Sequence, residues 1–514
     1  MYPVHTLEAL CAALPNALLE GQKDVAVSRI CHDSRQVVPG ALFVCLKGAT
    51  HDGHAFASEA VARGAVALAV NADAAHAVTM GLPREVPRLV VPDTRRALPI
   101  LACAFYQHPS HRLTMIGVTG TNGKTTTVRM IASILRAAGQ KVGTIGTLGA
   151  ELDGEPMESA HTTPEADQLQ ELLYRMVEGG AQAVAMEVSS HALAQFRTDG
   201  IAFNAGVFTN ITQDHLDFHG TMEAYFQAKA RLFTEYPVLY PRPDGQPFVN
   251  VINVTAWEGR DLVTMARGEI ITFSTGHTPA VLTASDVVLS PSAIRFTLHY
   301  DAGVERWALP LSLPVGGAFQ VANALAAVGA TVRLGVPVDA IVQGLAHLPP
   351  VPGRFEAVPT GGRGFSVIVD YAHTPDGLEN LLRSARELEP GRILLVFGCG
   401  GNRDRTKRPQ MGRIAGTLAD VAIVTSDNPR HEDPNAIIAE ILSGMDATKD
   451  PAITAQVQVE PDRRAAITLA IQQARPGDLV LIAGKGHEDY QIVGDAVLPF
   501  DDRQVTREVL ATLP

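Results

Sequence analysis

The sequence is poor in cysteine and has no apolar run of membrane-spanning length. Five cysteines occur among 514 residues, and none belongs to a C-x-x-C pair. An odd and scattered set favours a reduced chain over a disulfide framework. No uninterrupted apolar stretch reaches the roughly 18 residues that a spanning helix needs. The first residues, MYPVHTLEALCAALPN, lack the basic segment of a signal peptide, so we expect a cytoplasmic protein without a membrane span.

The sequence also lacks an excess of positive charge. Lys and Arg number 42 against 54 Asp and Glu, which gives a net charge of -12. This balance disfavours non-specific binding to nucleic acid or to an anionic membrane. It still allows a local cationic pocket for phosphates. We therefore expect small-molecule substrates and no nucleic acid partner.

The length of the chain and two linker-like segments predict an α/β fold of three domains. At roughly 150 residues per domain, 514 residues correspond to about three domains. The stretches YQHPSHR and HLPPVPGRFE are rich in polar residues, proline or glycine and are typical of linkers. We expect a small N-terminal α/β domain at 1–108, a central P-loop-type parallel-sheet domain at 109–350 and a C-terminal Rossmann-like α/β domain at 351–514.

Apolar strands alternate with glycine loops and helices in the two larger domains. LTMIGVTG reads as a buried strand and TTTVRMIASILRAAG as a helix that Gly139 ends. Such alternation predicts a parallel sheet covered on both faces. In the last domain, FSVIVDYAHTP, RILLVFGCGGNRD, VAIVTSDNP and LVLIAGKGHE each run from a strand into a polar loop. Open α/β sheets bind ligands at this end of their strands, so we expect these loops to form part of a site.

The stretch IGVTGTNGKTT is a variant phosphate loop. The common pattern G-x-x-x-x-G-K-[ST] would place glycine where this chain has Val118. The loop nevertheless follows a predicted strand and opens a predicted helix. Gly120 and Gly123 would let backbone N–H groups approach phosphate oxygens. Lys124 would reach the β- and γ-phosphates, and the Thr125 hydroxyl could bind Mg²⁺.

Three further motifs carry candidate metal-binding residues. Glu187 ends a predicted strand in MEVSSHALAQFR, where a carboxylate could hold Mg²⁺. His215 lies in TNITQDHLDFHG, where a plain surface histidine is the alternative. In AYFQAKARLF, Lys229 shares a helical face with Tyr225 and Phe233. Such a lysine ordinarily extends its ammonium to solvent.

The stretch SDNPRHEDP is the most specific of these motifs. Pro429 fixes a turn after a predicted strand and presents Asn428 and Arg430. A guanidinium group binds a carboxylate through two parallel hydrogen bonds. Alone, the tetrapeptide DNPR would be an ordinary turn.

Taken together and in this order, the motifs resemble the Mur ligase family, the ATP-dependent amide-bond enzymes of peptidoglycan assembly, over nearly the whole chain. The resemblance implies catalytic roles for Lys124, Glu187, His215 and Lys229. It implies that Lys229 reacts with CO₂ to form a carbamate, and that Mg²⁺ is held by Thr125, Glu187, His215 and the Lys229 carbamate. It implies ATP contacts from Gly120, Thr121, Asn122, Gly123, Lys124, Thr125, Thr126, Asn253, Asn323, Arg354 and Asp370.

The same resemblance implies two further substrates. SDNPR is similar to the signature of family members that add meso-diaminopimelate, whose distal carboxylate gives Arg430 a partner. The implied diaminopimelate contacts are Arg403, Asp427, Asn428, Arg430, Gly484 and Glu488. CHDSRQVVPGALFVCLKGATHDGHAF resembles the family's uridine-nucleotide-binding domain. The implied contacts to UDP-MurNAc-L-Ala-D-Glu are His32, Ser34, Ala49, Thr50, His51, His161, Thr162, Thr163, Ser189, Gln195 and Arg197.

The implied function is therefore a cytoplasmic, monomeric ATP-dependent ligase that joins meso-diaminopimelate to UDP-MurNAc-L-Ala-D-Glu during cell-wall synthesis. Three alternatives stay open. One is another ligase of the superfamily, such as a folylpolyglutamate synthase, against which SDNPR and the complete first domain argue. Another is a P-loop ATPase or kinase that makes no amide. The last is a nucleotide-binding scaffold, which would have no need of Lys124, Glu187 and His215.

Overall fold

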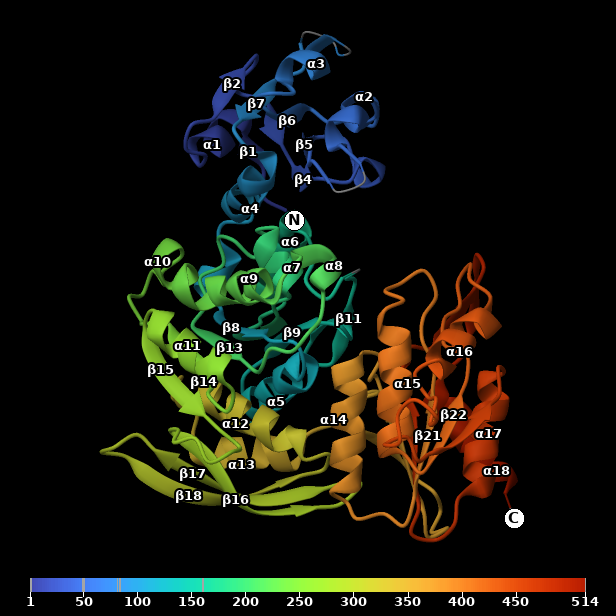
Figure 1. The fold of residues 1–514 in the computed structure, drawn as a ribbon. Coiled ribbons are helices and arrows are strands. Elements are labelled where there is room, and N and C mark those ends of the chain that lie inside the picture. Colours follow the sequence, from blue (N-terminus) through green and yellow to red (C-terminus); the bar gives the residue numbers. More distant parts are fainter. Residues whose placement is uncertain (1, 49–50, 81, 83–84, 160, 514) are drawn as a thin grey trace.

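Three large sheets follow one another along the chain in the computed structural model, each covered by helices (Figure 1). The structure describes residues 2–48, 51–80, 82, 85–159 and 161–513. The three-domain α/β fold predicted from the sequence is confirmed. Among the helices of these described residues, none combines the length and the apolar character needed to cross a bilayer.

The N-terminal sheet is parallel except at one edge, where β2 runs antiparallel to β7. Its strands are short apolar runs, and their alternate residues pack into two separate cores. The sheet order is β2 (Leu18–Glu20), β7 (Arg88–Val91), β6 (Ala67–Asn71), β5 (Ala41–Val44) and β4 (Arg29–Cys31), and β1 (His5–Thr6) pairs separately with β3 (Ala26–Val27). The helices are α1 (Leu7–Ala12), α2 (Ala57–Ala62), α3 (Ala75–Met80) and α4 (Thr94–Phe105).

The middle of the central sheet is parallel, as predicted, with β8 lying between β12 and β13. Both edges differ from the prediction, because a hairpin extends one side and an antiparallel meander extends the other. Alternating burial along β17 explains the meander, since only one face of it meets the core. The sheet order is β11 (Glu155–Met157), β10 (Gly149–Leu152), β9 (Val142–Gly146), β12 (Ala183–Glu187), β8 (Thr114–Thr119), β13 (Ala205–Phe208), β14 (Val249–Asn253), β15 (Glu269–Phe273), β16 (Leu282–Leu289), β17 (Ile294–Asp301) and β18 (Arg306–Leu313).

Helices cover both faces of this sheet. Ile116 and Val118 of β8 pack into one core with α5, whereas Met115 packs into the other core with α6 and α9. Successive strand residues point to opposite faces, so both faces of β8 are apolar. The helices of the first core are α5 (Lys124–Ala137), α12 (Phe319–Val332) and α13 (Val338–Ala346). On the other side lie α6 (Ala166–Glu178), α7 (Ser190–Ala194), α8 (Leu216–His219), α9 (Met222–Thr234), α10 (Tyr236–Leu239) and α11 (Trp257–Met265).

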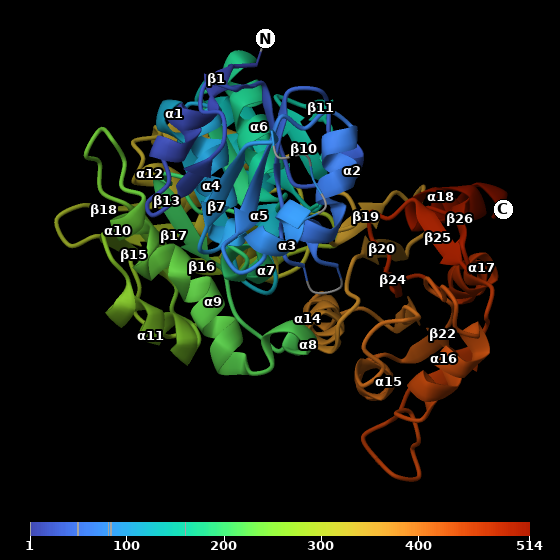
Figure 2. The same cartoon turned by 90° about the horizontal axis from the view of Figure 1, so that it is seen from above.

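The C-terminal sheet is parallel except for β19. This sheet lies to one side of the central domain, and α14 is on the side that faces the central domain (Figures 1 and 2). Its strands end at the loops that the sequence marked as candidate ligand loops. The sheet order is β19 (Glu356–Val358), β20 (Ser366–Asp370), β24 (Leu479–Ala483), β21 (Ile393–Phe397), β22 (Val421–Val424) and β23 (Gln456–Val459). The remaining elements are α14 (Pro375–Arg386), α15 (Lys407–Leu418), α16 (Pro434–Leu442), α17 (Arg463–Gln473), α18 (Asp502–Thr512) and the hairpin β25 (Tyr490–Val493) with β26 (Ala496–Pro499).

The linker into the C-terminal domain is anchored at Gly353. This residue has a φ of +63°, and a Cβ built on it would lie 2.2 Å from both the carbonyl carbon of Gly486 and the amide nitrogen of His487. The Gly353 carbonyl also accepts a hydrogen bond from the Tyr371 amide at 2.9 Å. Only glycine fits both the backbone angle and the contact. The linker is therefore fixed to the turn that follows β24.

Replacing Gly353 with alanine should destabilise the C-terminal domain by about 2 kcal/mol or more, because positive-φ strain and backbone overlap act together. Gly335→Ala is the matched control, since Gly335 has a φ of +79° and no atom within 4 Å of a built Cβ. Chemical denaturation of both variants would measure the difference. Equal losses of stability would contradict the packing role of Gly353.

Candidate active site

A cavity of about 670 Å³ lies between the central and C-terminal domains. The phosphate loop, the ends of β12 and β13 and the start of α14 all contribute to its wall. The predicted ATP residues that line it are Thr121, Asn122, Gly123, Lys124, Thr125, Thr126, Asn323, Arg354 and Asp370. Residues predicted to contact the other nucleotide substrate line the same cavity, namely His161, Thr162, Thr163, Ser189 and Arg197.

The phosphate loop takes its shape from two glycines between β8 and α5. Gly120 has a φ of +147°, and a Cβ there would lie 1.9 Å from the Thr209 hydroxyl oxygen. Gly123 has a φ of +86°, and a Cβ there would lie 2.3 Å from Asn323 Oδ1. The loop must pass this close to its neighbours to turn into the helix. The N-terminus of α5 then faces the cavity, which suits an anion.

Two lysines donate to one carbonyl oxygen of this loop. Lys124 Nζ donates to Gly120 O at 2.9 Å and to Thr121 O at 2.8 Å. Lys229 Nζ, which comes from α9, donates to Gly120 O at 2.8 Å. Lys229 is 1 % exposed and its ammonium lies 4.4 Å from the Tyr225 ring centroid.

Burial lowers the pKa of Lys229 well below its usual value, and the neighbouring Lys124 charge lowers it further. Burial also lowers the pKa of Lys124, which nearby Glu187 opposes. Among the described residues, Gly120 O is the only hydrogen-bond acceptor of Lys229. A neutral amine therefore fits this position better than an ammonium.

Glu187 lies at the end of β12, where the sequence predicted it. Its Oε1 accepts hydrogen bonds from the Thr125 hydroxyl at 2.9 Å and the Thr147 amide at 2.8 Å, and its Oε2 accepts from the Thr147 hydroxyl at 3.1 Å. The residue is 1 % exposed. A buried carboxylate next to a phosphate loop is therefore held in place from two sides.

His215 is half-exposed and lines the cavity with its backbone in the left-handed region, at a φ of 54°. Its ring lies 4.7 Å from that of His191 and at 3.4 Å from Asp214, measured from Nε2 to Oδ2. Partial burial lowers the pKa of His215, Asp214 opposes this shift, and the Lys124 and Lys229 charges add to it. The imidazole is thus neutral near pH 7, which is the form that binds metals.

These residues fit a magnesium ion. Mg²⁺ commonly takes only one or two protein carboxylates and completes its shell with water and phosphate oxygens. Thr125 and Glu187 provide a hydroxyl and a carboxylate 2.9 Å apart beside the phosphate loop. Among the described residues, no group of three or more His, Cys, Asp or Glu side chains has the geometry to hold a metal ion.

Arg354 and Asp370 lie where the C-terminal domain meets the loop. Arg354 Nη2 is 3.3 Å from the Thr125 hydroxyl oxygen, and its guanidinium lies over the Tyr371 ring at 4.7 Å. Burial raises the pKa of Asp370, and Arg354 together with two backbone amides opposes the shift.

Two other predicted ATP residues, Asn253 and Asn323, are differently placed. Asn253 does not line the cavity and instead donates to the Thr209 carbonyl at 2.7 Å. Asn323 does line it, and its amide donates to Gln320 Oε1 at 2.7 Å. Asn253 thus supports a wall of the site in this structure, and Gln320 orients Asn323.

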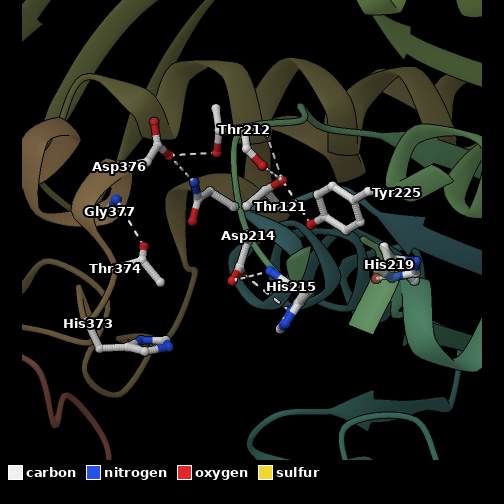
Figure 3. A network of polar contacts seen from close by, with 12 residues as sticks. Thr121, Thr212, Asp214, His215, His219, Tyr225, His373, Thr374, Asp376 and Gly377 are labelled. Carbon is white, nitrogen blue, oxygen red and sulfur yellow. Dashed lines mark hydrogen bonds and ion pairs between the residues drawn. The ribbon is translucent and has the colours of Figure 1, made fainter. Parts of the chain in front are cut away.

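Asp376 joins the two domains, although the sequence reading assigned it no role. Its Oδ2 accepts hydrogen bonds from Asn122 Nδ2 at 2.6 Å and from the Thr212 hydroxyl at 2.8 Å (Figure 3). Thr121 connects this contact to α9, because its hydroxyl lies 3.0 Å from the Tyr225 hydroxyl. The only signal in the sequence was that Asp376 directly follows the strand and polar loop FSVIVDYAHTP.

The residues predicted to bind the uridine nucleotide divide between two domains. Thr163 and Arg197 line the cavity, and Arg197 donates to the Thr163 carbonyl at 3.1 Å and to Gln195 Oε1 at 2.8 Å. His32 lies in the N-terminal domain, and its Nδ1 is 2.8 Å from Asp167 of α6. Ser34 and His51 also lie there, away from the cavity lining. Ala49 and Thr50 lie outside the described residues.

The predicted diaminopimelate residues gather at the carboxyl ends of β21, β22 and β24. Asn428 Nδ2 donates to Glu488 Oε2 at 2.9 Å. A Cβ built on Gly400 would lie 2.9 Å from Arg430 Nη1 and 3.8 Å from Arg403 Cγ, so these two arginines flank one turn. A Cβ built on Gly484 would lie 2.6 Å from Asp427 Oδ2. The three loops thus form a second polar site outside the 670 Å³ cavity.

Comparison with known families and proteins agrees with this geometry. The chain matches the Mur ligase middle domain at residues 118–331, the glutamate ligase domain of Mur ligases at 353–486 and the catalytic domain of the Mur ligase family at 26–106. The family resemblance seen in the sequence is confirmed.

Two relatives named UDP-N-acetylmuramoyl-L-alanyl-D-glutamate–2,6-diaminopimelate ligase are similar over almost their whole length. The protein from Geobacillus thermodenitrificans is 45% identical, covering 98% of this chain and 98% of its own, and that from Gloeobacter violaceus is 47% identical, covering 95% and 94%. A solved structure of a ligase with this name is 31% identical, with a TM-score of 0.67 and 99% of both chains covered. A MurF ligase from Thermotoga maritima, solved in complex with ADP, shares the fold at 18% identity, with a TM-score of 0.61 and 94% and 96% coverage.

Replacing Asp376 with alanine should loosen the contact between the two domains, because Asn122 and Thr212 lose a charged acceptor. We expect a loss of about 1–3 kcal/mol in the stability of this contact and faster amide hydrogen exchange in segments 120–126 and 374–380. Glu379→Ala is the matched control, since Glu379 lies one turn further along α14 and pairs only with Arg383 among the described residues. Unchanged exchange in both segments of the Asp376 variant would contradict this assignment.

Proposed function

The chain belongs to the Mur ligase family, and we propose that it is an ATP-dependent amide ligase that adds meso-diaminopimelate to UDP-MurNAc-L-Ala-D-Glu in cytoplasmic peptidoglycan precursor synthesis. The names of its relatives, and the similarity over almost their whole length, support this assignment. The observation that carries the assignment is a single cavity lined by residues of both predicted nucleotide sites. Lys124 of the phosphate loop lines it together with Thr163 and Arg197. A nucleotide phosphate and the carboxylate of a second substrate could meet there.

The proposed reaction begins at that carboxylate. A carboxylate is a poor electrophile, so one of its oxygens attacks the γ-phosphorus of ATP, which forms an acyl phosphate and releases ADP. The amine of diaminopimelate then attacks the acyl carbon, loses a proton and expels phosphate as the amide forms. Positioning and charge neutralisation supply most of the catalysis in phosphoryl transfer. Lys124 and the amides of the loop would neutralise phosphate oxygens.

Thr125, Glu187, His215 and the Lys229 carbamate are the residues that would hold Mg²⁺. When bound, the ion would neutralise charge on the transferring phosphate and the acyl oxygen. Glu187 contributes a carboxylate whose position Thr147 fixes on two sides. Arg354, which reaches Thr125 from the C-terminal domain, would bring a further positive charge once the domains meet around ATP.

The surroundings of Lys229 support its conversion to a carbamate. Its amine is buried, and Lys124 lies on the same carbonyl oxygen. The nitrogen of a neutral amine attacks the carbon of CO₂ and loses a proton, which turns the side chain into an anion. The anion would attract the Lys124 ammonium and provide an oxygen ligand.

We further propose that the three domains, 1–108, 109–350 and 351–514, bind the uridine nucleotide, ATP and the incoming amino acid, respectively. In the last domain, Arg430 would bind the distal carboxylate of diaminopimelate and Glu488 its distal ammonium. Arg403, Asp427, Asn428 and Gly484 would complete the pocket. The convergence of the three loops that carry these residues supports this assignment.

The function is tested by phosphate release from ATP in the presence of UDP-MurNAc-L-Ala-D-Glu. Release should depend on meso-diaminopimelate and should fall by about tenfold or more with L-lysine, which lacks the carboxylate that Arg430 would bind. Equal rates with both amino acids would remove the specificity role of Arg430. Release that ignores both would indicate a plain ATPase.

The carbamate is tested by replacing Lys229 with arginine, which keeps a cation but cannot react with CO₂ in this way. We expect phosphate release to fall by about a hundredfold or more, because a metal ligand is lost. Carbon-13 NMR of protein equilibrated with labelled bicarbonate should show a carbamate resonance that the variant lacks. A resonance of equal intensity in both proteins would show that the carbamate lies elsewhere.

A further inference from the structure

Lys485 is a buried cation within the second polar site, and neither the motifs nor the proposed mechanism uses it. Its side chain is 0% exposed. Nζ donates to Asn428 Oδ1 at 3.1 Å and to Glu488 Oε2 at 3.3 Å, and it lies 5.5 Å from the Tyr490 ring centroid. Burying an ammonium is costly unless acceptors surround it, so its position is determined by these partners.

Two glycines turn the chain so that Lys485 points inwards. It follows β24 between Gly484, with a φ of +114°, and Gly486, with a φ of +53°. A Cβ on Gly484 would lie 2.6 Å from Asp427 Oδ2, and one on Gly486 would lie 2.6 Å from Tyr371 Cβ. The Glu488 amide then donates to the Lys485 carbonyl at 2.9 Å. This tight turn brings Lys485 and Glu488 onto the same side of the loop.

Lys485 also determines which way the Asn428 amide faces. Asn428 Oδ1 accepts from Lys485 Nζ and, at 3.0 Å, from the Ile492 backbone amide. Its Nδ2 must then be the atom that donates to Glu488 Oε2, at 2.9 Å. Lysine has donors only, so the oxygen of Asn428 cannot be exchanged with its nitrogen without losing a bond.

Both contacts to Glu488 fall on one carboxylate oxygen. Lys485 and Asn428 donate to Oε2, and no described residue donates to Oε1. The side chain is 17% exposed, so Glu488 is not fully enclosed, and Oε1 keeps its capacity to accept a hydrogen bond. Two donors on one oxygen fix the plane of the carboxylate and hence the direction in which Oε1 accepts.

We propose that Lys485 is a positioning residue for the acceptor amino acid, holding the Glu488 carboxylate so that Oε1 receives the distal ammonium of the diamino acid. The inference rests on the proposed ligase function and assigns a specificity role within it. Lys485 acts through Glu488 and does not touch the substrate. It fixes the distance between the anionic end of the site at Glu488 and the cationic end at Arg430, and that distance selects a substrate with an ammonium and a carboxylate on one carbon.

The test compares kinetic constants of Lys485→Met, which keeps the length of the side chain and removes its charge and donors. We expect the KM for meso-diaminopimelate to rise about tenfold or more, with the KM for ATP and for UDP-MurNAc-L-Ala-D-Glu within about twofold of wild type. Lys485→Arg, which restores a buried cation and its donors, should recover part of the affinity. Lys449→Met is the matched control, because Lys449 is 78% exposed and pairs with Asp446 on the surface of the same domain.

A merely structural role would produce a different pattern. It would lower the melting temperature and change all three KM values and kcat together, and that result would overturn the proposal. A diaminopimelate KM within about twofold of wild type in a folded variant would also overturn it.

The double variant Lys485→Met/Glu488→Gln covers the case in which Lys485→Met alone does not fold, because it removes both charges of the buried pair. If Lys485 acts through Glu488, this variant should match Glu488→Gln alone in its diaminopimelate KM to within about threefold. A further tenfold rise would contradict the proposal. Failure of the ligase function itself is recognised separately, since wild-type protein would then show no phosphate release that depends on the amino acid.

Discussion

The carbonyl oxygen of Gly120 accepts hydrogen bonds from two lysines that come from different helices and lie 105 residues apart in the chain. This arrangement requires glycine, because any Cβ at this position would overlap the Thr209 hydroxyl. It also places Lys229 next to the Lys124 charge, and this charge together with the burial of Lys229 favours the neutral form of Lys229. The proposed carbamate, the metal site and the phosphate contacts all depend on this one point of the loop.

The phosphate loop also contacts the C-terminal domain. Asp376 binds Asn122 and Thr212, and Arg354 reaches Thr125, so the domain that we propose binds the acceptor amino acid also touches the phosphate loop. Through Thr121 and Tyr225 the same network reaches the helix that carries Lys229. A movement of the C-terminal domain would therefore change the hydrogen bonds that the phosphate loop makes. This coupling suits a reaction whose acyl phosphate must be protected from water until the amine arrives.

The proposed acceptor site is built in a different way. Glycines at positive φ make tight turns after parallel strands, and charged side chains fill the space between the turns. Lys485, Asn428 and Glu488 satisfy one another, so their geometry is set before a substrate binds. Preorganisation of this kind reduces the cost of ordering side chains when the substrate arrives.

The sequence by itself determined the strands, the phosphate loop and the candidate residues at strand ends, because these depend on local apolar runs and on glycines with special backbone angles. The predicted strand LTMIGVTG is β8, the predicted helix after it is α5, and Glu187 ends β12 as expected. The antiparallel edges of the central sheet, the link from Asp376 to Asn122, the indirect position of Asn253 and the burial of Lys485 were decided only by the tertiary structure. Each of these features pairs groups far apart in the chain. Which groups pair depends on how the domains pack, and a local pattern of residues does not contain that information.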